Sequence, residues 1–77
     1  MRALNNIFIA QIYELHTIKN DISLSDSIRA TAYSFSENLR YCFRLYEENI
    51  SSPTMRTSFF RVLQETDSFL KKLKEEA

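Results

Sequence analysis

Three long helical patterns, separated by two short breaks, dominate this sequence of 77 residues, and the chain contains no glycine. When residues are placed at steps of about 100° around a helix, the apolar side chains of each pattern gather on one face. The patterns predict helices over residues 3–20, 24–49 and 53–75. Because short connections join antiparallel neighbours, we expect an all-α, up-down-up three-helix bundle. Residues 1–77 are expected to form a single helical domain.

The apolar faces of the three segments define the expected core. Its members are Leu4, Ile7, Phe8, Ile12, Leu15 and Ile18, then Leu24, Ile28, Ala32, Phe35, Leu39, Cys42, Phe43, Tyr46 and Ile50, and finally Met55, Phe59, Val62, Leu63, Thr66, Phe69, Leu70 and Leu73. A chain of this length buries only ~60% of the surface that its unfolded form exposes, so the core is small. Association with a second chain is a common source of further stability for such folds.

Residues at the ends of the segments indicate where the helices begin and end. Asn20 can adopt the left-handed backbone conformation that often ends a helix. Ser23 and Asp26 have the spacing of a capping box at the start of the second helix. Ser52 suits the N-cap of the third helix, and Pro53 suits its first turn because the missing N–H has no helical partner there.

The charges of the chain are balanced, with ten basic and ten acidic residues. Nucleic-acid-binding domains usually carry a basic stripe, so binding to nucleic acid is not the leading expectation. The longest apolar run, residues 7–10, is too short to span a bilayer, and we expect no membrane association. A single cysteine fits a reducing compartment, which makes the cytoplasm the expected location.

Side chains suited to catalysis or metal binding are few in this sequence. His16, the one histidine, lies off the apolar face and is expected at the surface. Cys42, the one cysteine, lies on the apolar face and is expected to be core. One histidine and one cysteine cannot build a structural zinc site, and a chain without glycine has no glycine-rich phosphate loop. We therefore expect neither an enzyme nor a cofactor or metal site.

Apolar side chains outside the core faces favour contact with another protein. Ile9 and Tyr13 lie on a second face of the first segment, Tyr41 and Leu45 lie off the core face of the second, and Phe60 lies off that of the third. Tyrosine and phenylalanine are enriched at protein interfaces.

The unequal lengths of the first two segments indicate where a partner would bind. A first helix that turns back beside the start of the second should reach only to about residue 40, counted at 1.5 Å per residue. The tip of the hairpin, residues 41–50 and 53–60, would then lack a third helix and leave an apolar groove of ~15 Å uncovered. The predicted protein-binding residues are Tyr41, Leu45, Tyr46, Ile50, Met55, Phe59, Phe60, Ile9 and Tyr13.

Together these features favour a non-enzymatic, protein-binding helical module, such as a small chaperone, inhibitor or co-regulator. It would act through an apolar groove or as a homodimer, so its partner is another protein or a second copy of itself. One alternative is a nucleic-acid-binding regulator that uses Arg29, Arg40, Arg44 and Arg56. Another alternative is a toxin-immunity protein.

Overall fold

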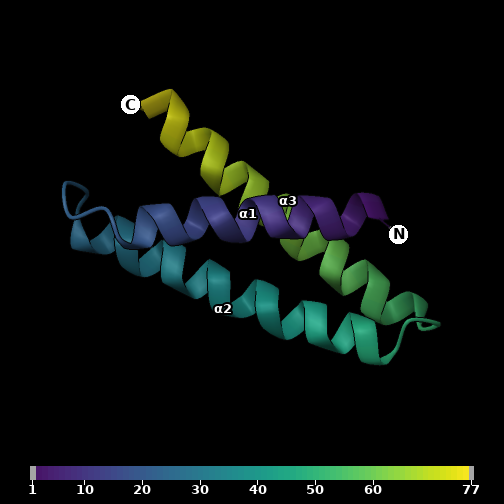
Figure 1. Ribbon diagram of the computed structural model, residues 1–77. Coiled ribbons are helices and arrows are strands. Elements are labelled where there is room, and N and C mark those ends of the chain that lie inside the picture. Colours follow the sequence, from purple (N-terminus) through teal and green to yellow (C-terminus); the bar gives the residue numbers. More distant parts are fainter. Residues whose placement is uncertain (1, 77) are drawn as a thin grey trace.

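The computed structural model describes residues 2–76, and the side chains of residues 4–76. It contains helices α1 (Arg2–Lys19), α2 (Asp26–Glu48) and α3 (Pro53–Glu76). α1 and α2 run antiparallel and side by side, and α3 starts at the far end of α2 and crosses behind α1 (Figure 1). The molecule is elongated, measuring 42 × 19 × 17 Å. The predicted all-α three-helix bundle is confirmed, with helix ends within two residues of those expected.

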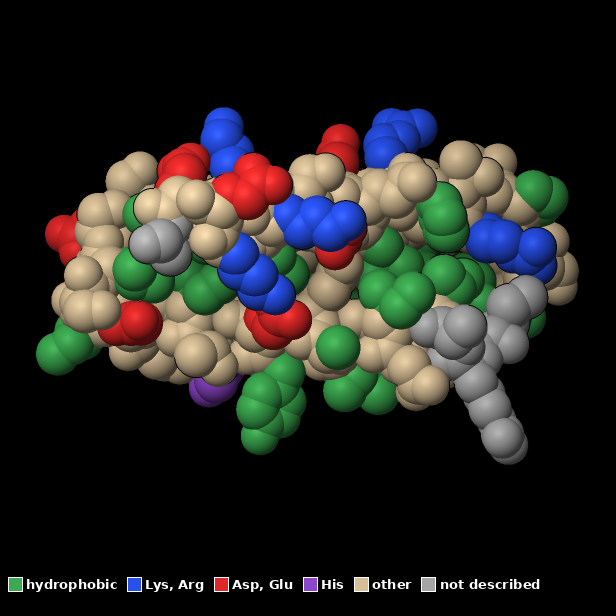
Figure 2. Space-filling model, turned by 90° about the horizontal axis from the view of Figure 1, so that it is seen from above, with side chains coloured by type: hydrophobic (Ala, Val, Ile, Leu, Met, Phe, Trp, Pro, Cys, Tyr) green, Lys and Arg blue, Asp and Glu red, His purple; other side chains and the backbone are tan. Residues whose placement is uncertain are grey.

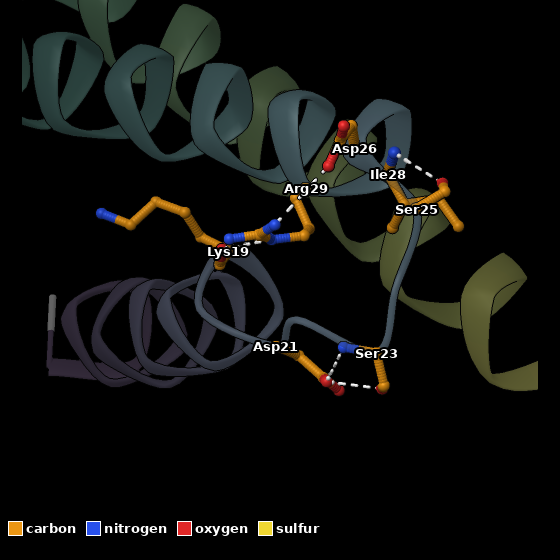
Figure 3. A network of polar contacts seen from close by, with 7 residues as sticks. All are labelled: Lys19, Asp21, Ser23, Ser25, Asp26, Ile28 and Arg29. Carbon is orange, nitrogen blue, oxygen red and sulfur yellow. Dashed lines mark hydrogen bonds and ion pairs between the residues drawn. The ribbon is translucent and has the colours of Figure 1, made fainter.

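Side-chain caps shape the turn between α1 and α2, and they differ from the predicted ones (Figure 3). Ser25 is the N-cap of α2, and its Oγ accepts a hydrogen bond from the N–H of Ile28 at 3.2 Å. The hydroxyl and N–H of Ser23 instead donate to the carboxylate of Asp21 at 2.6 and 3.0 Å. These two bonds lower the pKa of Asp21. The predicted capping box of Ser23 and Asp26 is therefore wrong, because Ser23 donates its hydrogen bonds to the nearer carboxylate of Asp21 in a local turn.

Polar contacts also tie the end of α1 to the start of α2. The Nε of Arg29 donates to the carbonyl of Lys19 at 3.0 Å, and its guanidinium lies 3.6 Å from the carboxylate of Asp26 (Figure 3). The side-chain amide of Asn20 donates to the carbonyl of His16 at 3.0 Å. No residue in the described range has a positive φ, so the predicted left-handed Asn20 is wrong. Its backbone N–H also donates to the carbonyl of His16, at 3.2 Å, so backbone and side chain together cap the helix.

The turn between α2 and α3 follows the prediction closely. The Oγ of Ser52 accepts a hydrogen bond from the N–H of Met55 at 3.3 Å, and Pro53 is the first residue of α3. Asn49 caps the end of α2, and its side-chain amide donates to a carbonyl of the last helical turn at 2.9 Å. Because α2 ends before it, Ile50 lies in the turn and is exposed, so its predicted place in the core is wrong.

The core runs along the length of the bundle. Its buried apolar members are Leu15, Ala32, Leu39, Tyr46, Phe59, Val62, Leu63 and Leu70. Thr66 is fully buried as well, and its hydroxyl donates to the carbonyl of Val62 at 2.8 Å. These residues were all on the predicted core faces. Ile7 is the exception on α1, because it is 45% exposed on the flank that faces α3.

Aromatic rings close the end of the bundle where the sequence predicts an open groove. Phe8 of α1 stacks on Phe43 of α2 with ring centroids 4.1 Å apart, and it meets the edge of the Phe59 ring at 5.9 Å. Phe59 also stacks on Tyr46 at 5.1 Å. α1 therefore covers the hairpin almost to its tip, and the predicted uncovered tip is wrong. The connection between α1 and α2 spans residues 20–25, longer than the expected 21–23, and the end of α1 lies beside Arg29 rather than beside the first residue of α2.

Candidate protein-binding surface

The predicted binding residues do not form one surface. Tyr46 and Phe59 are buried in the aromatic cluster, so their predicted place on an open surface is wrong. Leu45 and Met55 are half-buried. The exposed members are Ile9 and Tyr13 on α1, Tyr41 on α2, Ile50 in the second turn and Phe60 on α3.

Phe60 is the predicted residue that lies in a groove between two helices. Its side chain is 47% exposed and faces Leu4 and Ile7 across a hollow of about 290 Å³ between α1 and α3. An adjoining hollow extends this surface toward the start of α3. We call the combined surface the Phe60 groove, and it is lined by Leu4, Ile7, Gln11, Arg56, Thr57, Phe60, Leu63, Gln64 and Asp67.

Gln11 fixes the place where α1 and α3 cross and borders the Phe60 groove. The side chain is only 6% exposed, and its Nε2 donates to the backbone carbonyl of Leu63 at 3.0 Å. Its Oε1 is buried without a hydrogen-bond partner among the described residues. Leaving a buried acceptor unpaired costs ~1–3 kcal/mol. Sequence reasoning missed Gln11, although its helical spacing from Leu4 and Ile7 places all three on one flank of α1.

A second groove opens between α1 and α3 on the other side of their crossing. It has a volume of about 380 Å³ and lies near the first turn. Its lining residues are Glu14, Thr17, Ile18, Leu24, Leu70, Leu73 and Lys74, and we call it the Leu73 groove. The carboxylate of Glu14 and the ammonium of Lys74 lie 3.5 Å apart and join its two walls. Sequence reasoning missed this groove because its apolar residues were all assigned to the core.

Both grooves lie on the face that α1 and α3 form together. Figure 2 shows this face, with green apolar side chains near the grey N-terminal residues and again toward the opposite end. Blue and red side chains lie between these apolar areas in the same view. Two ion pairs belong to this face, Glu14 with Lys74 and Asp67 with Lys71 at 3.1 Å. Charged groups therefore separate two apolar surfaces that could each contact a partner.

The arginines proposed for nucleic-acid binding belong to separate parts of the molecule. Arg29 is engaged in the first turn. Arg40 and Arg44 flank Tyr41 on the outer side of α2, and the guanidinium of Arg44 lies 5.9 Å from the ring centroid of Tyr41. Arg56 borders the Phe60 groove on α3. The four arginines therefore do not form one continuous basic surface.

The side chains weighed for catalysis have ordinary surroundings. His16 is exposed and lies 3.2 Å from the side-chain amide of Asn20. Cys42 is half-buried against the core, and this burial raises the pKa of its thiol. Within residues 2–76, no group of three His, Cys, Asp or Glu side chains is placed to hold a metal ion. None of the helices in the same range is apolar enough over sufficient length to cross a membrane.

Comparison with known proteins found no matching family model, no similar curated protein and no similar solved structure.

Proposed function

We propose that this protein is a non-enzymatic helical module that binds another polypeptide through the Phe60 groove. The observation that supports this proposal is the pair of large apolar side chains, Phe60 and Ile7, that stay about half exposed in one hollow. Phenylalanine is enriched at protein interfaces, and here it shares a hollow with a second half-exposed apolar side chain. A small chaperone, an inhibitor or a co-regulator could act in this way, and the single thiol fits action in the cytoplasm.

The groove combines apolar anchors with a polar rim. Complete burial of a phenylalanine or isoleucine side chain is worth ~1.5–3 kcal/mol, so covering the exposed half of each anchor would contribute ~1 kcal/mol. Arg56 and Asp67 place opposite charges at the rim, where charges act mainly on the orientation and rate of association. This combination of apolar anchors and a charged rim along one surface supports the proposal.

The proposal is tested by capture of binding proteins from a lysate of the source organism. Phe60→Asp places a charge at the centre of the groove, and we expect it to abolish capture. Tyr41→Asp is the matched control, because Tyr41 is exposed on α2 outside both grooves. Both variants should keep the far-ultraviolet circular dichroism of the wild type. Unchanged capture by Phe60→Asp, or equal loss with Tyr41→Asp, would contradict the proposal.

A further inference from the structure

We infer that the occupant of the Phe60 groove is a second copy of this chain, related by a two-fold axis that sets α3 antiparallel to α3 of the other copy. This inference rests on the proposed function, since it names the partner of the same groove. It is argued from the order of charged and apolar side chains along the groove wall that α3 provides.

Arg56 and Asp67 lie at the two ends of this wall. They are about three helical turns apart, so both side chains point to the same side of α3, roughly 16 Å from each other along the axis. Both are exposed, and both line the groove. Phe60 lies between them with its side chain exposed, and the buried Leu63 forms the floor beside it. From the start of α3 toward its end, the wall therefore has a basic end, an apolar centre and an acidic end.

An antiparallel second copy is complementary to this order. In a two-fold interface, a contact from one residue to a second is repeated from the second to the first. Arg56 facing Asp67 of the other copy therefore makes two ion pairs, one at each end. The same register brings the exposed Phe60 side chains of the two copies together at the apolar centre, about 4.5 Å apart along the helix axis. A parallel, in-register pairing would instead set Arg56 against Arg56 and Asp67 against Asp67.

The net charge of the chain does not oppose this pairing, and one cation, Lys71, shares its acidic end. The formal net charge of the chain is zero, so two copies have no overall repulsion to overcome. Within one copy, the ammonium of Lys71 lies 3.1 Å from Oδ2 of Asp67. A carboxylate can accept hydrogen bonds at both oxygens, so Arg56 of the other copy would join this pair without displacing Lys71. In the Leu73 groove, by contrast, Glu14 and Lys74 already pair with each other across the two walls.

Charge reversal tests both the partner and the register. By sedimentation equilibrium, the wild type should exceed the monomer mass of 9.1 kDa at micromolar concentration. Arg56→Asp alone, or Asp67→Arg alone, sets like charges together at both ends of the interface. Each should weaken self-association by at least about tenfold. The double variant restores opposite charges, and its dissociation constant should return to within about threefold of the wild type.

Control variants separate this pairing from a general effect of charge. Arg61→Asp reverses a charge on α3 outside the groove, and Lys71→Ala removes the ion pair within one copy. Arg61→Asp should associate as the wild type does, and Lys71→Ala should associate at least as tightly, because it removes a cation that repels Arg56 of the other copy at Asp67. Arg56→Gln and Asp67→Asn only remove charge, so they should weaken association less than the reversals do. Circular dichroism of every variant establishes that it is folded.

Two results would overturn the inference. One is a wild type that remains monomeric over the whole concentration range, and the other is a double variant that associates no better than the single ones. Either result is distinguishable from failure of the proposed function. A monomer that loses capture of a different protein on Phe60→Asp keeps the groove as a binding surface, and only its occupant would be wrong.

Discussion

Phe59 and Phe60 are adjacent on α3, but their environments are opposite, and this contrast gives a quantitative prediction. Phe59 is fully buried, and its ring centroid lies 5.1, 5.5 and 5.9 Å from those of Tyr46, Phe43 and Phe8. Truncation of such a core phenylalanine to alanine costs ~3–5 kcal/mol. Phe60 is 47% exposed, so Phe60→Ala loses only about half the burial energy of the ring, ~1 kcal/mol.

Urea unfolding followed by far-ultraviolet circular dichroism measures both losses. A domain of 77 residues has a free energy of unfolding of ~4–12 kcal/mol, so Phe59→Ala should remove a large part of it. Phe60→Ala should lower the urea midpoint by no more than about 1 M, with the same dependence of stability on urea. Equal losses for the two variants would refute the assignment of their environments. A larger loss for Phe60→Ala would mean that α3 presents a different face to the core.

Three further predictions concern the core and the first turn. Leu39→Ala removes a fully buried side chain from the middle of α2 and should cost ~2–5 kcal/mol in the same urea assay; a loss below ~1 kcal/mol would contradict its burial. Ser25→Ala removes the N-cap of α2 and should lower the free energy of unfolding by ~0.5–2 kcal/mol, more than Ser23→Ala does. A larger loss for Ser23→Ala would instead support a capping box formed by Ser23 and Asp26. The lowered pKa of Asp21 means that its contribution to stability is present above the ordinary value of 3.8 and is lost as pH falls through the lower folded value. Titration by nuclear magnetic resonance should show this lowered pKa in the wild type and a higher one in Ser23→Ala, and equal values would contradict the hydrogen bond from the Ser23 hydroxyl.

Helical periodicity was sufficient to predict the elements, because each helix buries one face and the apolar residues recur on it. Leu39, near the middle of the narrow face of α2, is buried as predicted. The relative position of α1 and α2 could not be predicted in the same way. That position depends on the connection between the two helices, where Asp21 accepts a hydrogen bond from Ser23 and α2 begins at Asp26. In the structure the end of α1 contacts Arg29, one turn into α2, and Phe8 of α1 reaches Phe43 and Phe59 near the tip.

The candidate site was predictable only in part, because its walls come from helices that are distant in the sequence. Phe60 was correctly placed off the core face. The groove around it depends on the crossing of α1 and α3, where Gln11 binds the carbonyl of Leu63, 52 residues away. No local pattern encodes that contact. Ile7 shows the consequence, since its spacing fits the core while the crossing leaves it half exposed in the groove.

Site-specific photo-crosslinking tests most directly whether the Phe60 groove is the binding surface. A photoreactive phenylalanine analogue replaces Gln64, which is exposed in the groove, in one variant. In the matched variant it replaces Glu37, which is exposed beside Tyr41 on the outer side of α2. After irradiation in the source cells, we expect covalent protein adducts from position 64 and none from position 37. Adducts from position 37 alone, equal adducts from both positions, or none from either would contradict binding through the Phe60 groove.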